Sequence, residues 1–187
     1  RVLDRHQLGD GSVHYQQAGP VDGPPVLLVH GFSVPSYIYD PTFDALAAAG
    51  HRVIRYDLYG RGSSDRPRGA YDIARYTRQI DELLDALGIP GPVDLVGLSM
   101  GGVITASYAA EHPARVRRLV LIDPMATARE IGPLRWPLLG EYLFRVAVLP
   151  GMAAGQASDF VHPERFPDWS ERYRPQMRYF GFGRAIL

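Results

Sequence analysis

The sequence contains no cysteine, no lysine and no asparagine in its 187 residues. Without cysteine, disulfide bonds and thiolate metal sites are excluded, and without lysine the Gly-Lys-Ser/Thr phosphate-binding loop is excluded as well. The formal net charge is +0, which argues against nucleic acid or an acidic membrane as the main partner. No apolar run is long enough to span a bilayer, and no signal peptide is recognisable. We therefore expect a cytoplasmic protein without a membrane span.

Apolar residues make up 46% of the chain, which is enough for a packed core. Up to Pro124, buried strands alternate with amphipathic helices, a pattern that predicts a mostly parallel sheet flanked by helices, that is, an α/β fold. Strands are expected over 3–8, 12–18, 26–29, 53–56, 93–98 and 116–122, and helices over 41–49, 73–87 and 100–111. After Pro124 the strand pattern stops. We divide the chain into a core over 1–124 and a helical cap over 125–187.

The most informative stretch is Gly97-Leu98-Ser99-Met100-Gly101, which joins an apolar strand to an alanine-rich helix. A strand, a sharp turn and a helix would lift the Ser99 hydroxyl clear of the sheet and point the N–H groups of the helix N-terminus at charge developing beside it. Side chains at Gly97 and Gly101 would collide with the neighbouring strand and helix. The pattern therefore predicts a nucleophilic serine.

Other polar residues follow predicted strands, where ligands of parallel sheets bind. His30, Asp57 and Asp123 each come directly after an apolar run. Asp57 is expected to form a turn and tie down the glycine-rich loop that follows it. Three arginines of that loop could meet an anionic substrate, but a solvated loop face is the favoured interpretation; they are Arg61, Arg66 and Arg68.

Four motifs in chain order resemble the α/β-hydrolase family. They are His30-Gly31-Phe32, Asp57-Leu58-Tyr59-Gly60-Arg61-Gly62-Ser63-Ser64-Asp65, Gly97-Leu98-Ser99-Met100-Gly101-Gly102 and Leu121-Ile122-Asp123-Pro124. The resemblance is to the capped group of carboxylesterases, monoacylglycerol-lipase-like enzymes and meta-cleavage-product hydrolases. It implies that Ser99 is the nucleophile and that the backbone N–H groups of Phe32 and Met100 form the oxyanion hole. His30 and Gly31 would shape the oxyanion loop.

The resemblance also implies an acid and a histidine later in the chain, in the order serine, acid, histidine. Asp123 could be the acid; the favoured alternative is a turn residue before Pro124. His162 is the only histidine that could reach over the site, and an ordinary surface histidine is the favoured interpretation. We therefore expect a C-terminally truncated hydrolase, incomplete at its N-terminus as well, that lacks efficient turnover.

The predicted function is that of a serine hydrolase, which cleaves a carboxylic ester or related acyl bond of a small apolar substrate through an acyl-enzyme on Ser99. A fragment of the fold that binds an apolar ligand without chemistry and a C–C bond hydrolase remain alternatives. No ligand spacing for a metal or organic cofactor is present, so none is expected. Strand 116–122 would become an uncovered apolar edge, so we expect poor solubility or self-association through it.

Overall fold

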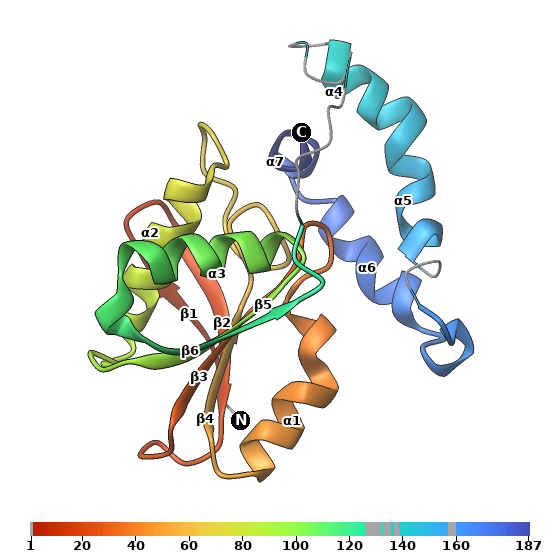
Figure 1. Cartoon of the computed structure of the whole chain (residues 1–187). Coiled ribbons are helices and arrows are strands. Elements are labelled where there is room, and N and C mark those ends of the chain that lie inside the picture. The colour runs from red at the N-terminus through yellow and green to blue at the C-terminus, as the bar shows by residue number, and fades with distance from the viewer. Residues whose placement is uncertain (1, 126–131, 133–135, 137–138, 157–159) are drawn as a thin grey trace. The chain divides into compact units, whose positions relative to one another are not determined.

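The structure, a computed structural model, describes residues 2–125, 132, 136, 139–156 and 160–187. The chain divides into two compact units, Arg1–Thr127 and Ala128–Leu187, called unit 1 and unit 2 below. Figure 1 shows that unit 1 contains the sheet and that unit 2 is built from helices. No helix in these described ranges combines the length and apolarity that crossing a bilayer requires.

Unit 1 is built on one six-stranded sheet with the strand order β1-β2-β4-β3-β5-β6 (Figure 1). The strands are β1 (Val2–Gln7), β2 (Ser12–Ala18), β3 (Pro25–Val29), β4 (Arg52–Tyr56), β5 (Val93–Leu98) and β6 (Val116–Ile122). β1 and β2 pair as an antiparallel hairpin and β2 pairs antiparallel with β4, whereas β3, β4, β5 and β6 are mutually parallel. The predicted fold class, a mostly parallel sheet flanked by helices, is confirmed.

Helices cover both faces of this sheet. They are a 3-10 helix (Ser36–Tyr39), α1 (Asp40–Ala48), α2 (Ile73–Ala86), α3 (Met100–Glu111) and a second 3-10 helix (Pro113–Arg115). Leu27 and Val29 of β3 belong to the buried cluster that contains the apolar residues of α2 and α3, whereas Val26 and Leu28 pack with Phe43 of α1. Successive residues of a strand point to opposite faces, so a continuous apolar run becomes a strand that is buried on both sides.

The order of the strands fixes where a ligand would bind. From β3 the chain adds β4 on one side and then crosses to add β5 on the other side. In open parallel sheets, ligands bind beyond the carboxyl ends of the two strands at which the winding direction reverses. Here those strands are β3 and β5, and the residues that follow them are His30 and Ser99.

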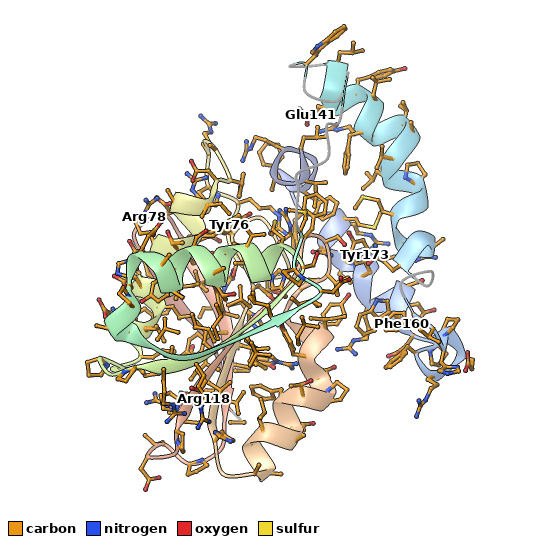
Figure 2. The ribbon with its side chains drawn as sticks, in the orientation of Figure 1. Tyr76, Arg78, Arg118, Glu141, Phe160 and Tyr173 are labelled. Carbon is orange, nitrogen blue, oxygen red and sulfur yellow. The ribbon has the colours of Figure 1, made fainter. Side chains whose placement is uncertain are left out.

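β6 lies at one edge of the sheet and pairs with β5 alone among the described strands. Four consecutive apolar residues of β6 are exposed, namely Leu119 (38%), Val120 (49%), Leu121 (43%) and Ile122 (41%). Arg118, on the same strand, is exposed as well (Figure 2). β1, at the opposite edge, carries charged residues, which protect a strand from pairing with another chain. On β6 the charged residues are confined to the start of the strand, at Arg117 and Arg118, and the apolar stretch after them has no such protection.

The regular elements in the described part of unit 2 are helical, and the predicted cap range 125–187 includes positions 126–131, 133–135, 137–138 and 157–159, which lie outside the described residues. Its helical elements are α4 (Leu139–Leu143), a π-helical segment (Phe144–Val148), α5 (Leu149–Gly155), a 3-10 helix (Pro163–Arg165), α6 (Trp169–Met177) and α7 (Phe182–Ile186). Phe160 stacks on Phe166 at 4.6 Å between ring centroids and meets Trp169 edge-on at 4.8 Å. Tyr173 of α6, labelled in Figure 2, is buried.

Candidate active site

Ser99 stands at the turn between β5 and α3 with φ +52° and ψ −115°. A positive φ is uncommon for a residue with a side chain and marks a strained turn. The turn is closed so tightly that a Cβ at Gly97 would overlap Thr105 Oγ1 and the Gly101 carbonyl, and a Cβ at Gly101 would overlap the carbonyl oxygens at the end of β3. The steric reason predicted for both glycines is therefore confirmed. Ser99 itself remains half-buried.

The segment after β6 wraps around this turn. Ser99 N–H donates to the Ile122 carbonyl at 3.0 Å, and the Ser99 carbonyl accepts from Met125 N–H at 3.1 Å. Asp123 lies between these two contacts, exposed and with φ +43°. Ser99 and Asp123 are the two residues other than glycine with positive φ in the described part of the chain. Two strained residues thus lie in neighbouring turns at the carboxyl ends of adjacent strands.

The loop after β3 approaches Ser99 from the other side. A Cβ at Gly31 would lie 3.3 Å from Ser99 Cβ and 3.9 Å from Ser99 Oγ. His30 is fully buried beneath this loop: its Nε2 accepts from Leu58 N–H at 2.9 Å, so Nδ1 carries the proton and donates to the Gly31 carbonyl at 2.8 Å. Burial lowers the pKa of His30 to about 4, although the Asp57 charge opposes the shift. His30 is therefore neutral at pH 7 and shapes the loop, as expected.

The hydrogen bond from His30 orients a peptide group that matters for the site. The Gly31 carbonyl and the Phe32 N–H belong to the same trans peptide, so they point in opposite directions. Because the carbonyl is held by the buried imidazole, the N–H is directed away from that imidazole. Within the described residues neither Phe32 N–H nor Met100 N–H has a hydrogen-bond acceptor. Both predicted oxyanion donors are thus unoccupied by protein groups.

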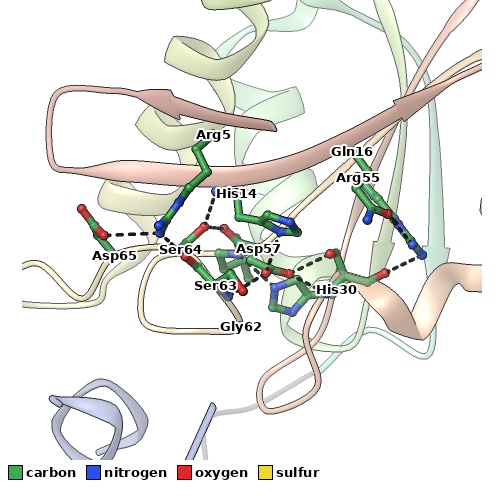
Figure 3. A network of polar contacts seen from close by, with 12 residues as sticks. Arg5, His14, Gln16, His30, Arg55, Asp57, Gly62, Ser63, Ser64 and Asp65 are labelled. Atoms are coloured by element: carbon green, nitrogen blue, oxygen red, sulfur yellow. Dashed lines mark hydrogen bonds and ion pairs between the residues drawn. The ribbon is translucent and has the colours of Figure 1, made fainter. Parts of the chain in front are cut away.

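Asp57, at the end of β4, organises the loops beneath the site (Figure 3). Its carboxylate accepts from Ser36 N–H at 2.9 Å, Ser36 Oγ at 2.7 Å, Ser63 N–H at 2.9 Å and His14 Nδ1 at 3.1 Å. A Cβ at Gly62, where φ is +47°, would overlap this carboxylate. Burial alone would raise the pKa of Asp57, but the hydrogen bond from His14 and the other donors outweigh it and lower the pKa to about 2. The prediction that Asp57 ties down the glycine-rich loop is confirmed.

The expectation of a solvated arginine face on this loop is wrong for one of its three members. Arg61 is 1% exposed, donates from Nε to the Phe32 carbonyl and places its guanidinium carbon 5.1 Å from the centre of the Phe32 ring. Arg66 is half-buried and donates to the Ser64 and Gly62 carbonyls at 2.8 and 2.9 Å. Arg68 is exposed, as expected. The loop folds back under the site, so its first arginine points inward.

None of the described contacts places a general base, a group that could accept the proton of the Ser99 hydroxyl, at Ser99. No histidine in the described ranges hydrogen-bonds the Ser99 hydroxyl or the Asp123 carboxylate. His162, in unit 2, is exposed and its Nδ1 lies 3.2 Å from Glu164 Oε1. The part of the chain that the structure describes also gathers no group of three His, Asp or Glu residues that could hold a metal. Of the predicted residues, the structure brings the Gly31 peptide and the turn that carries Asp123 against Ser99, and the oxyanion-hole role of Phe32 and Met100 stays a prediction.

This chain is similar in sequence or fold to known proteins whose names describe several different activities. RutD of Variovorax paradoxus, whose name describes it as a carbamate hydrolase, is 41% identical over 112 residues, covering 59% of this chain and 42% of its own length. A haloalkane dehalogenase of Psychrobacter cryohalolentis is 40% identical over 126 residues, 66% of this chain and 41% of its own. The crystal structure of the enol-lactonase from Burkholderia xenovorans superimposes with a TM-score of 0.80 at 25% identity, covering 98% of this chain and 71% of the other. The chain thus spans less than half the length of these curated relatives.

A family model matches a larger part of the chain than these two curated relatives do. The model of the alpha/beta hydrolase fold matches residues 24–176, which include β3 with its His30 loop, the Ser99 turn and most of unit 2. Together with the sheet order and the strained serine between β5 and α3, this match shows that the chain belongs to the alpha/beta hydrolase family.

Proposed function

We propose that this protein is a serine hydrolase that transfers the acyl group of a small apolar carboxylic ester, or of a related acyl compound, to Ser99. The observation that carries the proposal is the positive φ of Ser99, +52°, in a turn that only glycine neighbours permit. Strained backbone of this kind clusters at functional sites, where the surrounding structure maintains it. The exposed ring of Phe32, 42% accessible, would offer the substrate an apolar wall beside the serine.

The chemistry follows from the two free N–H groups. Attack of Ser99 Oγ on a carbonyl carbon moves an electron pair onto the carbonyl oxygen, and Phe32 N–H and Met100 N–H would stabilise that oxyanion. Each well-placed donor contributes roughly 3 kcal/mol to the transition state, because it meets the tetrahedral oxygen and not the planar carbonyl. The proton of the Ser99 hydroxyl passes to the general base and from it to the departing oxygen. Collapse then breaks the bond between the carbonyl carbon and that oxygen, expels the alcohol and leaves an ester on Ser99, which water can hydrolyse.

The covalent intermediate that a serine would form favours acyl compounds over alkyl halides as substrates. If a serine hydroxyl displaced halide from a saturated carbon, the product would be an ether, which has no carbonyl for water to attack. The names of two relatives, a carbamate hydrolase and an enol-lactonase, refer to acyl compounds, whereas a third is a haloalkane dehalogenase. A serine at this turn favours the acyl compounds.

We propose that the general base comes from outside unit 1, and that the chain in its present form turns over slowly. The motivation is that no histidine in the described residues forms a hydrogen bond with Ser99 Oγ. Serine hydrolases that lose one member of their catalytic triad retain rate enhancements of roughly 10³- to 10⁴-fold over water from oxyanion binding and substrate binding. Activated esters should therefore acylate Ser99 measurably, while deacylation lags.

The test is release of p-nitrophenolate from p-nitrophenyl acetate and p-nitrophenyl butyrate by the purified chain. We expect a phase of about one equivalent per protein that Ser99→Ala abolishes, followed by slow turnover, since the ester on Ser99 must wait for water. Ser107→Ala is the matched control, because Ser107 is a half-buried serine of α3 that lies two turns from the site. Release that is unchanged in Ser99→Ala would overturn the proposal.

A second candidate function, binding of an apolar ligand without chemistry, is favoured by a cavity in unit 2. The pocket has a volume of about 430 Å³, and its lining combines Phe144, Leu149, Met177, Tyr179 and Phe182 with the charged residues Glu141, Arg145 and Arg178. A pocket of this size, with an apolar wall and a few charged groups, suits a small aromatic molecule that carries a polar group. Calorimetric binding of 1-naphthol by a chain that cleaves no ester would support this candidate, and Ser99-dependent cleavage would decide against it.

A further inference from the structure

Arg61 is a buried arginine in a loop rich in glycine and serine, where solvent exposure would be expected. It is among the largest fully buried side chains of the described protein. Its Nε donates to the Phe32 carbonyl, and its guanidinium lies over the Phe32 ring. Arginine is rarely buried unless hydrogen bonds and charge compensate for the lost hydration. Two of the contacts that Arg61 makes in its buried position are with Phe32, a residue of the oxyanion loop.

The contacts of Phe32 show what Arg61 adds. The peptide before Phe32 is held through the Gly31 carbonyl by His30 Nδ1 at 2.8 Å. The peptide after Phe32 is held through the Phe32 carbonyl by Arg61. Since one peptide plane is fixed on each side of the residue, both backbone torsions of Phe32 are fixed as well. The direction of the Phe32 N–H is thus over-determined by two buried side chains.

The remainder of the loop is anchored by the same glycine-rich segment. Ser36, four residues after Phe32, donates its N–H and its hydroxyl to Asp57 at 2.9 and 2.7 Å. Asp57 and Arg61 lie four positions apart and are both buried. The segment from Phe32 to Ser36 is therefore held at both ends by charged residues of one loop, Arg61 at Phe32 and Asp57 at Ser36. The contact with Phe32 gives the buried position of Arg61 a structural reason.

We propose that Arg61 is a positioning residue for the oxyanion hole: it holds the Phe32 peptide so that the Phe32 N–H meets the oxyanion formed during acylation of Ser99. The inference rests on the proposed hydrolase function and adds a residue to it. Arg61 does not touch the reacting atoms; it acts through Phe32.

The expected effect is on rate and not on binding. An oxyanion donor acts on the transition state, so its displacement lowers the acylation rate constant with little change in substrate affinity. Losing one such donor lowers rates by about 10²- to 10³-fold, and a partial misplacement lowers them less. We expect Arg61→Met to lower the acylation rate constant by about 30-fold, with the dissociation constant for the ester within about 3-fold.

The experiment measures single-turnover release of p-nitrophenolate by the full chain over a range of p-nitrophenyl butyrate concentrations, which separates the rate constant from the dissociation constant. Arg61→Met keeps much of the side-chain length and removes the donor, whereas Arg61→Lys restores a charged donor and should recover at least part of the rate. Arg68→Met is the matched control, because Arg68 is an exposed arginine of the same loop whose side chain makes no hydrogen bond in the described structure. It should release p-nitrophenolate like the unmodified chain.

The amplitude of release separates positioning from a merely structural role. If Arg61 only stabilised the fold, Arg61→Met would lower the amount of active protein while each remaining active molecule reacted at the original rate. That outcome, or an unchanged rate constant, would overturn the inference. If Arg61→Met does not fold, the same comparison is made with Arg61→Gln, whose shorter neutral side chain should also lower the rate constant, and an unchanged rate constant at reduced amplitude would overturn the inference. Absence of Ser99-dependent release from the unmodified chain would instead overturn the proposed function.

Discussion

Replacing His30 with glutamine should remove a large part of the acid sensitivity of the fold. The pKa of the buried imidazole is lowered to about 4, whereas an unfolded histidine titrates near 6.5. Between these values the unfolded chain binds a proton that the folded chain excludes, so stability is fully present above about pH 6.5 and is lost as the pH falls towards 4. A difference of about 2.5 pH units at 1.36 kcal/mol per unit corresponds to about 3 kcal/mol.

The structure explains why the folded chain rejects this proton. A second proton on His30 would sit on Nε2, opposite the Leu58 N–H that donates to it at 2.9 Å. Two donors would then face each other in a site with no access to water, so the charged form is disfavoured. Glutamine can still accept from Leu58 N–H but does not titrate.

The assay is urea unfolding of both proteins at several pH values from 4.5 to 7. Subtracting one stability curve from the other cancels the titration of groups that both proteins share. The assay also stays above the pH interval from about 3.8 to 2, in which protonation of Asp57 would lower the stability of both proteins. We expect the advantage of the unmodified chain over His30→Gln to shrink by about 2 to 3 kcal/mol as the pH falls from 7 to 4.5. Parallel curves would refute the assignment of a buried neutral imidazole.

Three further predictions concern the turn, the loop anchor and the sheet edge. Gly97→Ala should destabilise the protein by more than about 2 kcal/mol in thermal unfolding, because its Cβ would overlap the Gly101 carbonyl oxygen and lie 2.7 Å from the Gly101 carbonyl carbon. Gly91→Ala, with nothing within 4 Å, should stay within about 0.5 kcal/mol. Asp57→Asn should lower the urea-derived stability by about 2 to 4 kcal/mol at pH 7, since donors that now meet a carboxylate would meet a neutral amide; a loss under 1 kcal/mol would contradict this. Light scattering should find concentration-dependent self-association through β6 that Leu121→Lys reverses, and a monomer at all concentrations would count against that interface.

The main elements of unit 1 could be predicted because each carries its information locally. β5, β6 and α3 have the bounds that apolar runs and flanking turn residues indicate, and Asp72 caps α2 by accepting from Arg75 N–H at 2.9 Å. Strand and helix periodicities are visible within ten residues of sequence, and so is the glycine-flanked serine. These features depend little on the rest of the chain.

The supporting contacts of the site could not be predicted, because they join residues that are distant in sequence. His14 reaches Asp57 only because β2 pairs antiparallel with β4, and the tautomer of His30 is fixed by Leu58, 28 positions away. The burial of Arg61 was missed for the same reason: a loop rich in glycine and serine predicts solvent exposure, and the direction in which it folds depends on Asp57.

The proposed hydrolase depends on Ser99 as the nucleophile and on Phe32 N–H and Met100 N–H as the groups that bind the oxyanion. Both roles can be tested in a crystal structure of the chain after reaction with a small alkyl fluorophosphonate, since the phosphoryl oxygen occupies the place of the oxyanion. We expect phosphorus bonded to Ser99 Oγ, with the phosphoryl oxygen about 2.7 to 3.1 Å from both nitrogens. A phosphoryl group on another residue, or an oxygen turned away from those two N–H groups, would contradict this expectation.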